Sequence, residues 1–141
     1  MEYVMAEAVA DGKERLIPEF RPWYTEIDIM EFLGHERDVL YATFHFYSFD
    51  GKKRTSSGKL QKGVDYTADF HTYVLEWELD EMRWYVDDQL IHSTREGIPH
   101  APHYLILNTA IGGAWPGNPD ATTQFPQYHD IDYVRVYQRA K

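Results

Sequence analysis

The stretch TYVLEWELDEMRWYVDDQLIHS, residues 72–93, decides the fold class of this chain. In its first part, Tyr73, Leu75 and Trp77 recur at every second position, which is the period of a β-strand. Asp80-Glu81 and Asp87-Asp88 then interrupt the apolar residues at the spacing of hairpin turns. The stretch therefore predicts three antiparallel strands joined by two short turns.

The regions on both sides of this stretch show further strand patterns. Residues 39–49 and 130–138 alternate, whereas residues 104–111 are nearly continuously apolar, as expected of a strand buried on both faces. Loops rich in Gly, Pro and Asn occupy residues 95–103 and 112–119. About six or seven antiparallel strands with almost no helix predict an all-β fold, an antiparallel β-sandwich or jelly roll.

Length and composition limit the organisation of the chain. Its 141 residues are the size of one domain, which we expect to extend over residues 1–141. There is no cysteine, so disulfides contribute nothing to stability. No apolar run approaches the ~18 to 20 residues that span a bilayer, and residues 1–10 do not have the pattern of a signal peptide. These features predict a soluble chain.

Charge restricts the class of partner. The formal net charge of -9 argues against nucleic acid and anionic membranes, because both favour clustered Lys and Arg. A neutral or cationic ligand fits better. The aromatic content is 16%, with 11 Tyr and 4 Trp, and such rings either fill a β-sandwich core or stack on sugars.

Three acids occur in a run of strand-forming residues, Glu26-Ile27-Asp28-Ile29-Met30-Glu31. Regular alternation would place Glu26 and Asp28 on one face and Glu31 on the other. A β-bulge at Ile29-Met30 would add one residue and return Glu31 to the face of the other two acids. Such a bulge is typical of strands beside active sites, so we predict one here.

Three carboxylates on one surface suggest acid–base chemistry. After the bulge, the backbones of Glu26 and Glu31 would lie roughly 13 Å apart. Side chains that lean toward each other could reach the ~5 to 5.5 Å separation of retaining glycosidases. Like charges this close raise the pKa of at least one carboxyl, so one Glu would act as acid and the other as nucleophile. The alternatives are an exposed acidic face and a calcium site.

Five blocks of sequence resemble glycoside hydrolase family 16 of the laminarinase type. They are EIDIMEFLGH, YATFHFY, FHTYVLEWELDEMRWYVDDQLIH, YLILNTAIGGAWPG and DIDYVRVYQ, in the order and spacing of that family. The resemblance implies a β-jelly roll that cleaves internal β-1,3 or mixed β-1,3/1,4 glucan bonds with retention of configuration. It also implies secretion.

The resemblance assigns the roles that the residues alone leave open. It implies that Glu26 is the nucleophile, that Glu31 is the general acid/base and that Asp28 assists both electrostatically. No cofactor is needed for this chemistry.

The resemblance also points to residues outside the carboxylate strand. His45, Trp23 and Trp115 match positions that border or line the sugar cleft, although a core or rim histidine would fit His45 as well. Asp132 matches a residue that helps to hold a structural calcium in relatives, but an ordinary surface acid is the simpler interpretation. Calcium is therefore the one metal that the resemblance suggests.

The chain departs from the family ahead of residue 26. Only 25 residues precede Glu26, where a complete relative has several strands, and residues 3–9 could be a remnant of one such strand. Missing strands would expose sheet edges and the apolar residues 105–107, so we expect a dimer or a strand-swapped assembly, or a fold completed by a second polypeptide. A shortened, self-contained sandwich with an open cleft is the competing arrangement.

Two other functions remain open at this stage. Relatives with the same motif cut agars or carrageenans, but sulfated substrates call for basic cleft residues, and this chain has 14 basic residues against 23 acidic ones. A neutral glucan is therefore preferred. The second alternative is a carbohydrate-binding sandwich without turnover, which the missing strands favour and the intact acids oppose.

Overall fold

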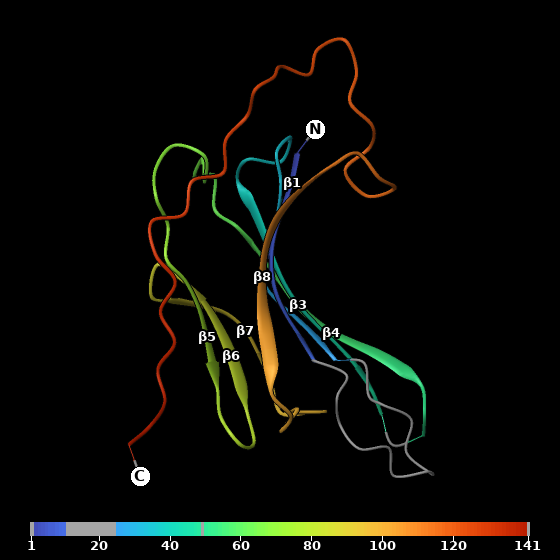
Figure 1. Ribbon diagram of the computed structural model, residues 1–141, viewed down its shortest axis with the longest axis vertical. Coiled ribbons are helices and arrows are strands. Elements are labelled where there is room, and N and C mark those ends of the chain that lie inside the picture. Colours follow the sequence, from blue (N-terminus) through green and yellow to red (C-terminus); the bar gives the residue numbers. More distant parts are fainter. Residues whose placement is uncertain (1, 11–24, 49, 141) are drawn as a thin grey trace.

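The computed structural model describes residues 2–10, 25–48 and 50–140, with the backbone alone for residues 2–10 (Figure 1). The described part is all-β, as predicted, and contains no helix, so none that could cross a membrane. Its strands are β1 (Glu2–Ala10), β2 (Glu26–Leu33), β3 (Val39–Tyr47), β4 (Lys53–Gln61), β5 (Tyr73–Trp77), β6 (Met82–Val86), β7 (Gln89–Thr94) and β8 (His103–Ile111).

The strands form two antiparallel sheets. One has the order β4-β3-β2-β1-β8, and the other is the meander β5-β6-β7 that residues 72–93 predicted. Asp87 and Asp88 adopt positive φ angles of 47° and 63°, which close the β6–β7 hairpin with the twist that a two-residue turn requires. β1 confirms the remnant strand predicted for residues 3–9.

The core lies between the two sheets. Alternate residues of β3 face inward, and the pattern predicted from residues 39–49 is confirmed because Leu40, Ala42 and Phe44 are completely buried. Met82 and Trp84 of β6 join Ala42 and Phe44 in one core cluster from the three-stranded sheet. A second cluster continues the same layer and consists of Met30, Phe32, Leu40, Tyr66 and Val86. The core therefore unites β2, β3 and β6.

β4 is a strand that the sequence analysis did not identify. Its sequence, KRTSSGKLQ, contains one large apolar residue and lacks the alternation that marks a strand. It is held to β7 by close contact: a Cβ on Gly58 would lie 2.6 Å from His92 Cβ and from Ile91 O. Ser56 Oγ and His92 Nε2 are also 2.9 Å apart. Small residues therefore replace apolar ones at this contact between the sheets.

The prediction for residues 104–111 is correct in type but wrong in burial. β8 is an edge strand of the five-stranded sheet and pairs with β1 alone. Leu105 and Leu107 are each 40% exposed, because no strand of the described second sheet lies over them. The continuous apolar run thus marks a strand with one paired edge and an open apolar face.

The prediction of a strand at residues 130–138 is wrong for this structure. The segment is irregular and runs beside β5 in Figure 1, where Arg139 pairs with Glu78 at 2.7 Å. Val136 is 89% exposed, and no ladder partner supports the segment within the described residues. Alternation defines the two faces of a strand, but the strand itself needs a neighbour to accept its backbone hydrogen bonds.

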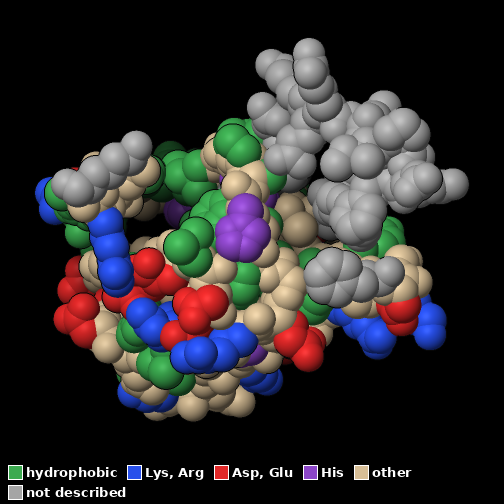
Figure 2. All heavy atoms as spheres, turned by 90° about the horizontal axis from the view of Figure 1, so that it is seen from below, with side chains coloured by type: hydrophobic (Ala, Val, Ile, Leu, Met, Phe, Trp, Pro, Cys, Tyr) green, Lys and Arg blue, Asp and Glu red, His purple; other side chains and the backbone are tan. Residues whose placement is uncertain are grey.

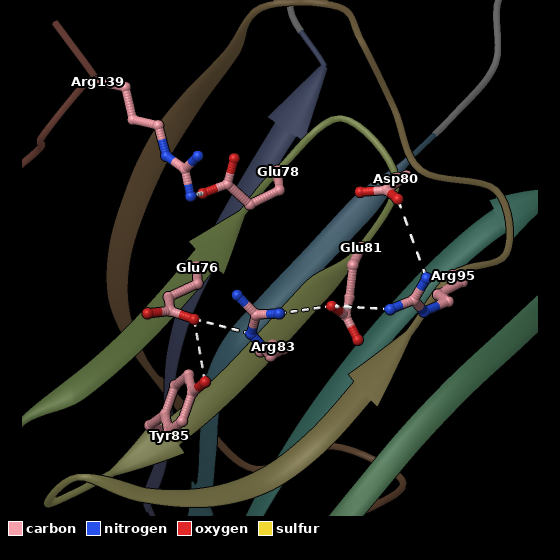
Figure 3. Close-up of polar contacts among 8 residues, drawn as sticks. All are labelled: Glu76, Glu78, Asp80, Glu81, Arg83, Tyr85, Arg95 and Arg139. Carbon is pink, nitrogen blue, oxygen red and sulfur yellow. Dashed lines mark hydrogen bonds and ion pairs between the residues drawn. The ribbon is translucent and has the colours of Figure 1, made fainter.

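The outer face of the three-stranded sheet is charged. Figure 3 shows a chain of ion pairs in which Arg83 bridges Glu76 and Glu81, and Arg95 joins Glu81 to Asp80. Seen from below, the molecule presents acidic and basic side chains next to each other (Figure 2). This charged face is exposed to solvent, and the apolar core lies on the other face of the same sheet.

Candidate active site

The bulge predicted in the carboxylate strand is present. Between β2 and β3 the register shifts after Asp28, so that Ile29 and Met30 together lie opposite Ala42. On the β1 side, Met30 pairs with Ala6 and Asp28 with Glu7, which leaves Ile29 as the extra residue. Inward-facing positions therefore change from Ile27 before the bulge to Met30 after it.

The bulge brings the three acids to one face of the sheet. Residues directly opposite each other in neighbouring strands project to the same side. The partners of Glu26, Asp28 and Glu31 on β3 are His45, Thr43 and Tyr41, in that order. These partners are alternate residues of one strand, so the acids share the outward face of β3.

Glu31 and Thr43 form a buried contact on this face. Thr43 Oγ1 donates a hydrogen bond to Glu31 Oε2 over 2.9 Å, and Glu31 is only 8% exposed. A hydroxyl donor fixes the orientation of the carboxyl. Unlike the cation of a salt bridge, it adds no opposite charge beside the carboxyl.

Asp28 is the most deeply buried of the three acids, at 1% exposure. Its Oδ2 lies 3.6 Å from His45 Nε2, and the other ring nitrogen of His45 is 2.9 Å from Thr55 Oγ1. Carboxylate, imidazole and hydroxyl thus follow one another across β2, β3 and β4. His45 lies beside the carboxylate strand, as expected.

Trp84 supports the bulge from the opposite sheet. Its indole Nε1 donates a hydrogen bond to the backbone oxygen of Asp28 over 3.1 Å, and the side chain is completely buried. The contact holds the residue immediately before the bulge from inside the core. The sequence analysis assigned no role to Trp84; its signal was an indole N–H in a buried strand, which needs an acceptor.

Tyr41 connects the site to the loop that follows β8. Trp115, in that loop, meets the Tyr41 ring edge-on, with centroids 5.1 Å apart. The Tyr41 hydroxyl donates to Glu36 Oε2 over 2.7 Å. Burial, the bond to Glu36, and the charges of Glu36 and Glu31 raise the pKa of Tyr41 to about 12, so it remains a neutral donor. Trp115 therefore lies at the Glu31 end of the carboxylate row.

The Glu26 end is anchored by a contact across β1. Thr25 is buried, and its Oγ1 lies 2.9 Å from Nε2 of His103 on β8. The His103 ring packs edge-on against Trp77 at 4.9 Å. The backbone that carries Glu26 is thereby fixed to both sheets.

Asn108 is a further polar residue on this face. It pairs with Met5 of β1, which pairs in turn with Glu31, so the three positions lie in one row. Asn108 Oδ1 is buried and has no hydrogen-bond partner in the described structure. The sequence analysis passed over it, although an amide within an apolar run was a visible signal.

Two predicted residues are not part of the described site. Trp23 falls outside the described residues. Asp132 is exposed in the irregular C-terminal segment, and the described residues contain no group of three or more His, Asp or Glu side chains placed to hold a metal. The role of Asp132 in a calcium site therefore stays a prediction from resemblance.

Comparison with known proteins relates this chain to a family. The model of the family described as glycosyl hydrolases family 16 matches residues 16–135. The chain belongs to this family. The bulged carboxylate strand is therefore part of a glycoside hydrolase domain, and the jelly-roll class predicted from the sequence is confirmed by its structural neighbours.

Proteins that are similar to this chain include β-glucanases and a laminarinase. The β-glucanase of Rhodothermus marinus is 37% identical over 126 residues, which are 80% of this chain and 44% of that protein. The laminarinase catalytic domain of Thermotoga maritima has 39% identity and a TM-score of 0.68, over 88% of this chain and 53% of that one. The endo-β-1,3-glucanase of Pyrococcus furiosus has 39% identity and a TM-score of 0.70, over 89% and 51%. This family 16 chain thus spans about half the length of these relatives.

Proposed function

We propose that this chain hydrolyses internal β-1,3 or mixed β-1,3/1,4 bonds of a neutral β-glucan with retention of configuration. The observation that supports the proposal is the bulge, because it places Glu31 on the face of Glu26 and Asp28. The glucanases among its relatives supply the substrate class.

The proposed reaction has two displacements. Glu31 protonates the glycosidic oxygen while Glu26 attacks the anomeric carbon, which forms a glycosyl-enzyme ester and releases the leaving sugar. Glu31 then removes a proton from water, and the water oxygen displaces Glu26 from the anomeric carbon. Asp28, next to His45, stabilises the positive charge that develops at the anomeric carbon in the transition state of each step.

Reducing-sugar release from laminarin, lichenan and agarose tests the activity. We expect release from laminarin or lichenan, and a loss of about 10³-fold or more in Glu26→Gln because the nucleophile is removed. Folding of the variant is checked by circular dichroism. Release from agarose alone would contradict the choice of glucan.

Azide distinguishes the roles of the two glutamates. In Glu26→Ala, azide can take the place of the nucleophile, and one displacement gives an α-glycosyl azide. In Glu31→Ala, the glycosyl-enzyme still forms from a substrate with a good leaving group, and azide then gives the β-azide. The reverse pair of products would exchange the two assignments.

A binding sandwich without turnover is the second candidate. The observation that favours it is coverage, since the chain spans 44% of the Rhodothermus protein and 53% of the Thermotoga domain. Retained laminarin binding with no release from any of the polysaccharides would identify this function.

Completion of the cleft by another chain is also part of the proposal. The open apolar face of β8 and the exposed C-terminal segment fit a dimer or a strand-swapped assembly. Size-exclusion chromatography with light scattering gives the mass directly. A monodisperse species of 16.6 kDa would contradict the assembly.

We expect such an enzyme to be secreted, because its polymeric substrate lies outside the cell. Fractionation of cells that express the complete gene product tests this. Activity confined to the cell interior would contradict it.

A further inference from the structure

The hydrogen bond between Thr43 and Glu31 runs diagonally across two strands. In the register of β2 and β3, Thr43 lies opposite Asp28, whereas the partner of Glu31 is Tyr41. Thr43 Oγ1 nevertheless donates to Glu31 Oε2 over 2.9 Å. Diagonal neighbours in an antiparallel pair lie within reach of long side chains. The bond therefore ties the Glu31 carboxyl to a position level with Asp28, in the middle of the carboxylate row.

This position matters because the backbones of the two glutamates are far apart. The bulge leaves them roughly 13 Å apart, whereas a retaining mechanism needs carboxyls ~5 to 5.5 Å apart. Both side chains must therefore turn toward Asp28, which lies between them on β2. Thr43 stands opposite Asp28, so a bond to Thr43 holds Glu31 in that direction.

The contact is buried and uses the whole donor capacity of the hydroxyl. Thr43 and Glu31 are each 8% exposed, so water competes little for the bond. A threonine hydroxyl has one hydrogen to donate, and Thr43 donates it to Glu31. Tyr41, directly opposite Glu31, donates its own hydroxyl hydrogen to Glu36 over 2.7 Å. Orientation of Glu31 by a hydroxyl thus comes from its diagonal neighbour.

The bond also makes the two oxygens of the Glu31 carboxyl unequal. Oε2 accepts the hydrogen of Thr43, and in a carboxylic acid the carbonyl oxygen is the better acceptor. When Glu31 is protonated, Oε2 is therefore the carbonyl oxygen and Oε1 carries the proton. In the first displacement, this proton passes to the glycosidic oxygen, which keeps the electron pair of its broken bond to the anomeric carbon while Glu26 forms the new bond.

A simpler explanation is that Thr43 is a strand residue whose buried hydroxyl needs an acceptor. Threonine favours strands, and buried hydroxyls are generally hydrogen-bonded. On that explanation, loss of the hydroxyl would lower stability and would affect the hydrolysis of all substrates alike. A role in positioning the acid predicts instead a loss that depends on how much the leaving group needs a proton.

We propose that Thr43 is a positioning residue for the general acid/base, because its hydroxyl holds the Glu31 carboxyl level with Asp28 and directs the proton to Oε1. The inference rests on the proposed glucanase function, from which it takes the role of Glu31. It adds a residue of β3 to the catalytic arrangement on β2.

Two substrates with different leaving groups test this role. Laminarin releases a sugar hydroxyl, which needs protonation, whereas dinitrophenyl β-laminaribioside releases a phenolate that leaves without a proton. Thr43→Val keeps the shape of the side chain. In this variant we expect kcat/KM to fall about 10- to 100-fold for laminarin and less than about threefold for the aryl glycoside. Thr43→Ser should restore the ratio of the two values, because serine keeps the donor.

Thr109→Val is the matched control for the loss of a threonine hydroxyl. Thr109 lies on β8, two strands from β2, and its hydroxyl contacts His129. This variant should leave the ratio of the two kcat/KM values unchanged. Equal losses on both substrates in Thr43→Val would show that Thr43 is only structural and would overturn the inference. An unchanged kcat/KM for laminarin would overturn it as well, and both results would leave the glucanase proposal standing.

The Glu31 carboxyl gives a second readout that needs no turnover. In protein labelled with carbon-13 at the glutamate carboxyls, the NMR signal of Glu31 is assigned by its absence from Glu31→Gln. This signal should shift in Thr43→Val and stay in place in Thr109→Val. A shift in a chain that cuts neither substrate would retain Thr43 as the residue that positions Glu31 and would reject the glucanase proposal. No shift in Thr43→Val would overturn the inference, whatever the activity.

Discussion

The five-stranded sheet has a covered side and an open side. β2, β3 and β4 lie against the meander β5-β6-β7, and the buried apolar residues of the described structure come from these strands and the loops beside them. β8, at the opposite edge, contributes none of them and exposes Leu105 and Leu107. The acids stand on β2, on the covered side of this division.

The two sides of the sheet differ in how completely the described residues cover them. The carboxylate strand is held by a full layer of core, including the bond from Trp84 to Asp28. Geometry at the acids is therefore secured by the described residues, whereas the β8 side is where another chain or segment would add stability.

The largest difference should come from equivalent leucine truncations on the two sides. Leu40→Ala removes a completely buried side chain of β3 and should lower the free energy of unfolding by about 2 to 5 kcal/mol. Leu107→Ala on β8 should cost far less, because its side chain is partly solvated already. Urea unfolding of both variants measures the two losses. Equal losses would show that β8 is covered in solution.

Overpacking should be the next largest effect. Gly58→Val places atoms against the His92 side chain and the Ile91 backbone, and we expect a loss of about 1 to 3 kcal/mol in the free energy of unfolding. The matched control is Ser57→Val, the adjacent residue on the open face of β4, where space is available. A stability of Gly58→Val equal to that of the control would mean that β4 does not pack on β7 as described.

Loss of the Trp84 hydrogen bond should affect both stability and turnover. Trp84→Phe leaves the Asp28 carbonyl without its indole donor, at a cost of about 1 to 3 kcal/mol. Trp77→Phe is the control, since its indole donates to Pro99 O and a phenyl ring in its place can keep the edge-on packing against His103. Laminarin hydrolysis at a temperature where both variants are folded should fall in Trp84→Phe alone. Equal activity would show that the bulge needs no support from β6.

The smallest effect should be a dependence of stability on pH. Burial lowers the pKa of His92 below 6.5, so the unfolded chain takes up this proton more readily than the folded one. The contribution is therefore complete above pH 6.5 and is lost as the pH falls below it. Urea unfolding at pH 7.5 and pH 5.5 should show less dependence in His92→Gln. His129→Gln, whose ring contacts Thr109 on the β8 side, is the control.

Sequence reasoning was most successful where packing and chemistry act on the same residues. The meander and the bulge were predictable, because apolar alternation identifies the inner face and the acids must lie on the outer one. β4 escaped notice because its contact with β7 needs small residues, Ser56 and Gly58, which carry no hydrophobic signal.

The incorrect predictions concern the structural neighbours of a segment and not its own residues. Residues 104–111 and 130–138 have sequences suited to strands, but burial and strand formation depend on what lies next to them. An apolar run reports the preference of a segment and not whether its neighbour is present. The roles of Glu26 and Glu31 also came from family resemblance, since their types and spacing are symmetric.

The single extra residue at Ile29 makes the active site sensitive to the length of its strand. Substitution at Ile29 would keep the register, because two residues would still lie opposite Ala42. Deletion of Ile29 would instead restore regular alternation. Either Glu31, or Glu26 and Asp28 together, would then point into the core. In evolutionary terms, a point change at Ile29 would leave the two glutamates on one face, but an insertion or deletion of one codon would separate them.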